Sequence, residues 1–183
     1  MINNNHINFR DRDLVFVDTE TTGMELNHEI IEIGLVRVSG YNFSVLEELE
    51  IKIKPRRLEI ADQESLRIAH YSEEDWKDAK EPEDALKIFL QKTEGAILAG
   101  HNLLFDWYYI NKALAEYNLK PTFWYKGLDT VSLAWQKLRQ NPGIKSFGLK
   151  ELAAYFEIEQ EKPHSALDDA KTAYRVFMKL SKL

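Results

Sequence analysis

The stretch Leu14-Val-Phe-Val-Asp-Thr-Glu-Thr-Thr-Gly23 decides the fold, because it joins an apolar run to two acids and a turn. An apolar run bounded by a turn signal is typical of a buried strand, expected here over about Leu14–Thr19. Residues two apart on a strand point to the same face, so Asp18 and Glu20 are expected side by side at its end. Two carboxylates held there repel each other and lose hydration, so a cation between them would stabilise the pair. The simpler alternative is an exposed strand end with two solvated acids.

Length and composition indicate one soluble domain. At 183 residues, with 44% hydrophobic and 30% charged residues, the chain has the size and balance of a single globular domain. We expect residues 1–12 to form a polar tail and residues 13–183 to form the domain. No apolar run is long enough to cross a membrane, and the N-terminus lacks the basic and apolar segments of a secretory signal. The absence of cysteine excludes disulfides and thiolate metal sites and is typical of a cytoplasmic protein.

The charge is unevenly distributed along the chain. A net charge of −6, taken alone, argues against the binding of nucleic acid. Residues 112–150, however, hold seven basic residues and only two acids. The seven basic residues are Lys112, Lys120, Lys126, Lys137, Arg139, Lys145 and Lys150. They either form a surface that attracts a polyanion or are scattered solvated positions.

The hydrophobic pattern predicts antiparallel strands in the first third of the chain. Residues Ile30–Val38 are rich in β-branched side chains and indicate a second strand. Leu49–Lys54 alternates apolar and polar residues, which is typical of a strand with one face in water, and such strands pair antiparallel. Short helices are expected over about Asp62–Ile68 and Glu73–Asp78, and Pro82 is well placed to begin another.

Strand–helix alternation is expected from about residue 96 onward. The predicted elements are a strand at Ala96–Ala99, a helix at Leu103–Tyr117 capped by Asn102, a strand at Phe123–Leu128, a helix over residues 131–138 with Trp135 on its apolar stripe, and helices over residues 149–156 and 166–180. Three antiparallel strands followed by two strand–helix units predict an α/β fold, a mixed five-stranded sheet flanked by helices. Ligands of such sheets tend to bind outside strand ends, near helix N-termini.

Acids and a histidine lie at the boundaries of these elements. Asp106 is one turn inside the helix after the fourth strand, and Asp168 is one turn inside the last helix, four residues after His164. Both helix starts would aim their acids at the sheet edge where Asp18 ends its strand, so that four acids meet with a histidine at the rim. Asp169 is expected to point elsewhere on its helix.

Four converging carboxylates without cysteine suit a hard cation such as Mg²⁺ or Mn²⁺. With two ions roughly 3.5–4 Å apart, such a site has the form used in phosphoryl chemistry, in which a water is activated and the charge on the leaving oxygen is stabilised. A histidine at the rim, such as His164, would then deprotonate that water.

Each of these residues also has a simpler interpretation. An acid in a first helical turn is commonly a surface residue that is favourable to the helix dipole, and a loop histidine is commonly exposed. His101 is expected to be a satisfied structural histidine. The aromatic residues Phe105, Trp107, Tyr108 and Tyr109 either stack on bases or pack in the core, and for most of them core packing is favoured.

Three motifs carry a resemblance to a known family. Val17-Asp-Thr-Glu-Thr-Thr-Gly23, His101-Asn-Leu-Leu-Phe-Asp106 and His164-Ser-Ala-Leu-Asp-Asp-Ala170 resemble, in this order, the three exonuclease motifs of the DnaQ-like family. This is the DEDDh group of 3′–5′ exonucleases, which includes the proofreading epsilon subunit of bacterial DNA polymerase III and ribonuclease T. The similarity runs from about Leu14 to Phe177 and implies a ribonuclease H-like fold.

The resemblance implies a role for each matching acid and for the histidine. Asp18, Glu20, Asp106 and Asp168 would hold two divalent cations, Mg²⁺ or Mn²⁺, and Asp18 would bridge them. His164 would be the general base. The five residues would together form the catalytic site.

The resemblance also implies where the substrate binds. The backbone around Thr21 and Thr22 would contact the 3′-terminal nucleotide, and Met24 would act as an apolar wedge near its base. Asn102 and Phe105 would line the nucleotide pocket.

The predicted function is therefore a metal-dependent 3′–5′ exonuclease that removes nucleotides one at a time from single-stranded DNA or RNA and releases 5′-mononucleotides, with DNA favoured. The choice between DNA and RNA depends on contacts to the 2′-hydroxyl, which the motifs do not specify. The basic stretch Lys137–Lys150 is the candidate for handling the strand upstream of the cleaved end. The alternative is a subunit of a polymerase or repair complex whose main role is protein binding, with proofreading activity in the assembly.

Overall fold

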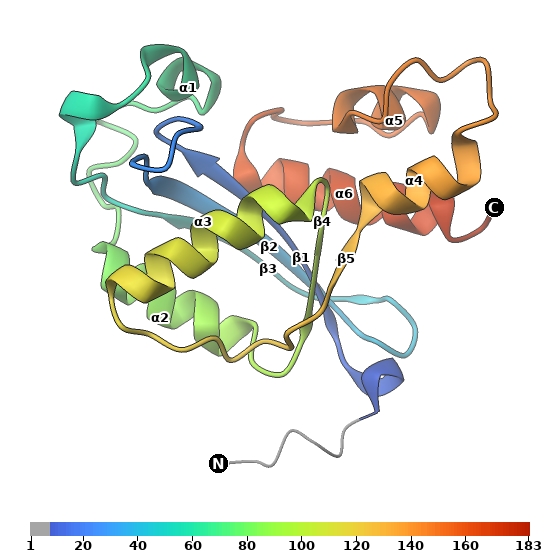
Figure 1. Cartoon of the computed structure of the whole chain (residues 1–183), viewed down its shortest axis with the longest axis horizontal. Helices are drawn as coiled ribbons and strands as arrows, with labels where there is room; N and C mark the ends of the chain where they lie inside the picture. Colours follow the sequence, from blue (N-terminus) through green and yellow to red (C-terminus); the bar gives the residue numbers. More distant parts are fainter. Residues whose placement is uncertain (1–7) are drawn as a thin grey trace.

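One mixed sheet forms the centre of the molecule (Figure 1). The computed structural model describes residues 8–183. The strands are β1 (Leu14–Thr21), β2 (Ile30–Val38), β3 (Val45–Lys52), β4 (Ile97–Gly100) and β5 (Gly127–Asp129), in the spatial order β3-β2-β1-β4-β5. β1 pairs antiparallel with β2 and β2 with β3, whereas β1 pairs parallel with β4 and β4 with β5. The predicted antiparallel meander and the mixed five-stranded α/β fold are confirmed.

Helices cover both faces of the sheet (Figure 1). They are α1 (Gln63–Ile68), α2 (Pro82–Lys92), α3 (Leu103–Glu116), α4 (Thr130–Leu138), α5 (Leu149–Tyr155) and α6 (Ala166–Leu180), with short 3-10 turns at Phe9–Asp11 and Leu58–Ile60. α2 and α3 lie on one face, α6 lies on the other, and α4 and α5 pack beside α6. Among the described residues, no helix combines the length and the apolar character needed to cross a membrane.

The alternation of side chains along β1 builds two cores at once. Val15 and Val17 pack toward α2 and α3, while Leu14 and Phe16 pack toward α6. All four are buried, and burial of such a side chain contributes roughly 1.5–3 kcal/mol. Continued along the strand, the same alternation places Asp18 and Glu20 on the α6 face.

Small residues bring α6 close to the sheet. Its buried side includes Ala166, Ala170 and Ala173, which are at most 1% exposed. Without longer side chains in between, the helix backbone lies directly over β2 and β1. The predicted helix over residues 166–180 is confirmed at both ends.

Two predictions in the first half of the chain were wrong in detail. β3 begins at Val45 rather than Leu49. Its first residues are held in the strand by backbone pairing with β2, and their exposed side chains show no alternating apolar pattern that could have predicted them. Residues 73–78 form turns rather than the predicted helix. There the indole of Trp76 donates a hydrogen bond of 2.9 Å to the Ile31 carbonyl, so a tertiary contact determines the local path.

Two further differences lie in the second half. The strand predicted at Phe123–Leu128 is shorter and lies further along the chain: β5 spans Gly127–Asp129 and pairs with β4, which is itself four residues long. Trp135 is 55% exposed, because the buried side of α4 is formed by Ala134 and Leu138 instead.

The predicted polar tail covers residues 1–12, of which residues 1–7 lie outside the described part of the chain. Residues 9–11 form a 3-10 turn. Arg12 is buried, donates a hydrogen bond of 2.6 Å to the Gly95 carbonyl and lies over the ring of Trp124. The packed part of the chain therefore includes Arg12.

Candidate active site

An acidic cluster forms where β1 ends, at the sheet edge that also receives the ends of β4 and β5. Ligand atoms of Glu20, His164 and Asp169 all lie within 4.8 Å of one another. Asp18 is half-buried beside them, one alternation earlier on the same face of β1. The side chains come from β1 and from the start of α6, two segments separated by more than a hundred residues in the sequence.

Asp106 approaches the same place from α3. Its carboxylate is 3% exposed and accepts a hydrogen bond of 2.8 Å from the Thr19 hydroxyl. Thr19 points to the opposite face of β1 from Asp18 and Glu20, so this strand holds Asp106 from one side and presents its own acids on the other. The role of Thr19 was not predicted from the sequence, although its position between the two acids marks it.

Asp169, and not the predicted Asp168, faces the cluster. The buried Asp168 carboxylate is not part of this group and accepts a hydrogen bond of 3.1 Å from the backbone N–H of Lys162. Asp169 lies three residues after Ala166 and four before Ala173, on the side of α6 that packs against the sheet. The spacing of buried alanines was a usable signal, because it shows which side of the helix is turned inward.

Mutual repulsion and burial raise the pKa values of these acids. Burial raises the pKa of Glu20 to about 8, with Asp169 and Glu32 adding to the effect. Burial likewise raises the pKa of Asp106 to about 7, against the opposing hydrogen bond from Thr19. The pKa of Asp18 lies well above its usual range because of burial and the carboxylates around it.

Divalent cations fit this donor set. Carboxylate oxygens and an imidazole nitrogen are ligands that Mg²⁺ or Mn²⁺ accepts, and the acids are close enough to share an ion. The raised pKa values show that the ionised acids lack a compensating charge within the protein. A bound cation would supply that charge.

The turn after β1 is held firmly by its own side chains. Thr22 is fully buried; its hydroxyl accepts a hydrogen bond from the Glu29 N–H, and its backbone N–H and carbonyl bond to Glu29 and Asp62. The Thr21 hydroxyl donates to the Gly23 carbonyl. The Thr22 N–H is thus already paired within the protein, while the predicted substrate contact at Thr22 stays a prediction. Thr22 belongs to the frame of the turn.

Tyr109 and His28 brace this turn from behind. The Tyr109 hydroxyl lies 2.9 Å from the carbonyl oxygens of Gly23 and Glu25, to which it donates. The His28 Nδ1 atom accepts a hydrogen bond from the Glu25 N–H, and its ring leaves no room for a side chain at position 23. Gly23 has a φ of 153°, so a glycine suits this position on both counts.

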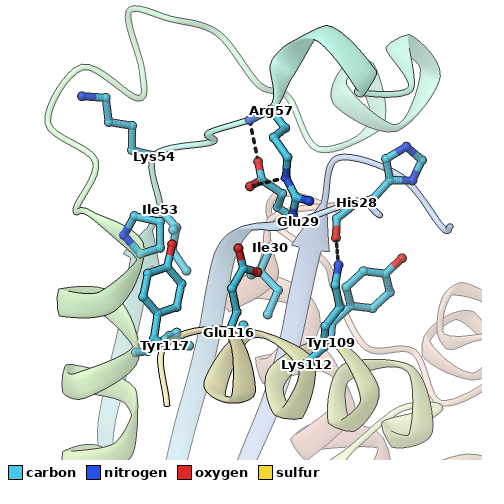
Figure 2. Close-up of a pocket in the computed structure, with 13 residues that line it drawn as sticks. His28, Glu29, Ile30, Ile53, Lys54, Arg57, Tyr109, Lys112, Glu116 and Tyr117 are labelled. Carbon is cyan, nitrogen blue, oxygen red and sulfur yellow. Dashed lines mark hydrogen bonds and ion pairs between the residues drawn. The ribbon is translucent and has the colours of Figure 1, made fainter. Parts of the chain in front are cut away.

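A pocket lies on the outer side of this brace, between α3, α2 and the start of β2 (Figure 2). Figure 2 shows the Lys112 ammonium reaching the His28 carbonyl, and Arg57 paired with Glu29 across the top of the pocket. The cations of this pocket thus bond to the protein itself and stabilise the base of the turn.

The remaining predicted substrate contacts, Met24, Asn102 and Phe105, lie in the turn after β1 and at the start of α3. Met24 is 80% exposed at the tip of the turn. Asn102 is exposed with a φ of 61°; it occupies the N-cap position of α3, as predicted, but its side chain makes no capping hydrogen bond. The half-buried Phe105 packs against Tyr109, with ring centroids 4.8 Å apart.

The side-chain acceptor at the start of α3 comes from Asp129, which is also the N-cap residue of α4. One of its carboxylate oxygens accepts a hydrogen bond of 2.7 Å from the Leu103 N–H, and the other accepts one of 2.7 Å from the Val131 N–H of α4. One side chain thereby orients two helices at the site edge. His101 bonds to the Thr130 hydroxyl at 2.8 Å, which confirms the predicted structural role.

The metal-free protein is expected to lose stability as pH rises. Glu20 and Asp106 have folded-state pKa values of about 8 and 7, above their ordinary values of 4.5 and 3.8. Their contribution is therefore fully present below about pH 4 and is lost as pH rises through 7 to 8. Thermal denaturation in EDTA should show a falling melting temperature between pH 5 and pH 8, and Mg²⁺ should raise it most at pH 8. A Glu20→Gln, Asp106→Asn double variant should flatten the slope; an equal slope in that variant would contradict the assignment.

The comparisons with known proteins agree with this geometry. A family model described as Exonuclease (RNase_T) matches residues 15–177. The chain is 32% identical over 169 residues to a PolC-type DNA polymerase III of Caldanaerobacter subterraneus subsp. tengcongensis, covering 92% of this chain and 11% of that protein. It is 30% identical over 178 residues to the DNA polymerase III epsilon subunit of Aquifex aeolicus, covering 94% of this chain and 82% of the relative.

Solved structures share the fold. The nuclease domain of 3′hExo, a DEDDh family member bound to rAMP, has a TM-score of 0.76 at 18% identity, over 93% of this chain and 92% of that one. E. coli exonuclease I in complex with a dT13 oligonucleotide has a TM-score of 0.77 at 18% identity, over 93% of this chain and 40% of that one. The mixed sheet is thus the ribonuclease H-like fold of these nucleases. The chain belongs to the exonuclease family RNase_T, whose DEDDh members its three motifs resemble and for which the use of divalent metal ions is typical.

Proposed function

We propose that this chain hydrolyses single-stranded nucleic acid from its 3′ end and releases 5′-mononucleotides. The observation that carries the proposal is the meeting of Asp18, Glu20, Asp106, Asp169 and His164 at one sheet edge, in a chain of the exonuclease family. Residues 13–183 would act as one exonuclease domain. The cytoplasmic location expected from the cysteine-free sequence stays a prediction.

Two divalent cations, Mg²⁺ or Mn²⁺, would be held by Asp18, Glu20, Asp106 and Asp169, with Asp169 in place of Asp168. By the family resemblance, Asp18 would help to hold both ions. Burial and the charges of Asp106, Asp169 and Glu20 raise its pKa. When bound, such ions stabilise the charge that develops on the phosphate and make water a stronger nucleophile. The protein itself supplies the fixed positions of the four carboxylates.

His164 would remove the proton from the attacking water. Its side chain is exposed, so solvent and substrate reach it, and its ring lies in the same group as Glu20 and Asp169. Its backbone has a φ of 63° and its N–H donates to the Asp169 carboxylate at 3.2 Å, which ties the base to its neighbouring acid. The water oxygen would bond to phosphorus as the bond to the preceding 3′ oxygen breaks, leaving a shortened strand with a 3′-hydroxyl.

The 3′-terminal nucleotide would lie against the turn after β1. Met24 is an exposed apolar side chain of this turn, and Asn102 and Phe105 lie at the start of α3, close in sequence to Asp106. The turn can act as a rigid stop because Tyr109 and His28 hold its carbonyls and amides from behind. The exposed Met24 side chain is then free to contact the base.

The connection between α4 and α5 would handle the strand upstream of the cleaved end. Lys145 is exposed in this connection, Lys137 and Lys150 are exposed on the helices at its two ends, and the backbone of Phe147 bonds to His101. Lys112, by contrast, lies against Tyr109 and the His28 carbonyl, so the basic residues of 112–150 do not act as one patch. Phosphate contacts from this connection would make binding sensitive to salt.

A side-by-side digestion tests the proposal. Purified protein with Mn²⁺ is expected to shorten a 5′-labelled single-stranded DNA one nucleotide at a time and to act on RNA of the same sequence more slowly. A duplex with a mismatched 3′ end measures proofreading in the same assay. An intact 5′-labelled strand, under conditions in which a control exonuclease shortens it, would reject the proposal.

A second candidate function is proofreading within a polymerase or repair complex. This role is favoured by the similarity to DNA polymerases. Two of the relatives are PolC-type DNA polymerase III proteins, and this chain spans 11% to 12% of their length. Co-purification of the chain with a polymerase subunit from its source cell would support this role. A free monomer or homodimer with full activity would count against it.

A further inference from the structure

The backbone at the start of α6 packs directly against β2 at Gly34, which has no side chain. Gly34 lies opposite Asp18 in the sheet, and a Cβ atom placed on Gly34 would come within 2.1 Å of the Ala166 carbonyl carbon and the Leu167 nitrogen. The helix backbone therefore occupies the space that any other residue would fill. This contact determines how closely α6 approaches the strand that pairs with β1.

Glu32, two residues earlier on β2, binds the same helix end. Its side chain is buried at 2% exposure, and its carboxylate accepts a hydrogen bond of 2.8 Å from the Ala166 N–H and one of 3.4 Å from the Ser165 hydroxyl. The first N–H groups of a helix have no partner within it, and a carboxylate is favourable at that end. Burial and the neighbouring Glu50 raise the pKa of Glu32 to about 7.

The helix end that Glu32 holds carries two of the cluster residues. His164 directly precedes the N-cap residue Ser165, and the Asp169 N–H donates to the Ser165 carbonyl at 3.0 Å. His164 and Asp169 are joined by their own hydrogen bond of 3.2 Å. These hydrogen bonds tie both residues to the first turn of α6.

Glu32 also faces Glu20 directly across the β1–β2 pair. One cross-strand pair therefore presents an acid of the cluster on β1 and the hydrogen-bond acceptor for α6 on β2. No other described side chain is recorded as accepting from the Ala166 N–H.

We propose that Glu32 is a positioning residue for the nuclease reaction, which seats the N-terminus of α6 on Gly34 so that His164 and Asp169 lie at the productive distance from Glu20. This inference rests on the proposed exonuclease function. Glu32 itself contacts neither water nor substrate in this role. Its carboxylate acts through the backbone of Ala166.

Three substitutions at position 32 distinguish the effects of the length of the side chain, its charge and its hydrogen-bond acceptor. Glu32→Gln keeps an acceptor oxygen at the same reach and should retain kcat within about threefold. Glu32→Met keeps the length without an acceptor, and Glu32→Asp keeps the charge at a shorter reach. Glu32→Met and Glu32→Asp should both lower kcat, with KM changed less than about threefold. The loss in Glu32→Met should be roughly 10–100-fold, because misplacement of the reacting groups by about 1 Å costs on the order of 100-fold.

Hydrogen exchange of the metal-free variants gives a readout independent of activity. Exchange at the amides of residues 165–169 should become faster in Glu32→Met and stay unchanged in Glu32→Gln. Glu50→Gln is the matched control, because Glu50 is exposed and touches only the Ser165 hydroxyl of this helix end; both measurements should match the wild type.

Full kcat in Glu32→Met, or an equal loss in Glu32→Gln and Glu32→Met, would overturn the inference. If Glu32→Met fails to fold, Glu32→Asp decides, and full kcat there overturns it. A wild-type protein without nuclease activity rejects the proposed function instead, and the exchange pattern then still shows whether Glu32 seats the helix.

Discussion

Replacing Asp18 with asparagine is expected to reduce nucleotide release by roughly 10³-fold or more. A metal site supplies several kcal/mol of transition-state stabilisation, and each 1.4 kcal/mol is about tenfold in rate. The charges of Asp106, Asp169 and Glu20 all act on Asp18, which places it among the other acids. Its removal would therefore weaken the binding of any ion that these acids hold. Single-turnover digestion of a short single strand in Mg²⁺ measures the effect.

The same substitution should make the metal-free protein more stable. The pKa of Asp18 lies well above its usual range, so the ionised form opposes folding at neutral pH, and asparagine removes that charge at nearly constant size. The melting temperature in EDTA at pH 8 should therefore rise, while the stabilisation by Mg²⁺ should shrink. A variant that loses activity and stability together would show that Asp18 supports the fold rather than the metal site.

Asp169→Asn and Asp168→Asn are expected to differ sharply, although the residues are neighbours. Asp169 faces Glu20 and His164, so its loss should lower kcat by roughly 10³-fold, comparable to the loss of another ligand that stabilises the transition state. Asp168 accepts a hydrogen bond from the Lys162 N–H, and the asparagine oxygen can accept the same bond. Asp168→Asn should therefore stay within about threefold of the wild type.

Calorimetric titration with Mn²⁺ separates the two variants without a nuclease assay. Asp169→Asn should bind more weakly or with lower stoichiometry, and Asp168→Asn should match the wild type. The opposite ranking of the two variants would return the predicted role to Asp168 and would show that α6 rotates when the ions bind.

Several parts of the fold could be predicted because their signals are local. The apolar run of β1 and the 3.6-residue spacing of α6 determine a strand and a helix without reference to the rest of the chain. The bounds of the edge strand β3 and of the short strand β5 were predicted only in part, because they depend on pairing with β2 and β4. Trp76 shows the same limit, since its bond to the Ile31 carbonyl shapes residues 73–78.

The sequence, through its resemblance to the exonuclease motifs, predicted an acidic site at the end of β1, the elements that carry it, and Asp18, Glu20, Asp106 and His164 as members. Only the tertiary structure decided between Asp168 and Asp169. That choice depends on how far α6 is rotated against the sheet, which is set by Gly34 and Glu32 on a distant strand. A periodicity within the helix gives the spacing of its side chains, whereas their direction toward β1 comes from contacts between segments far apart in the chain.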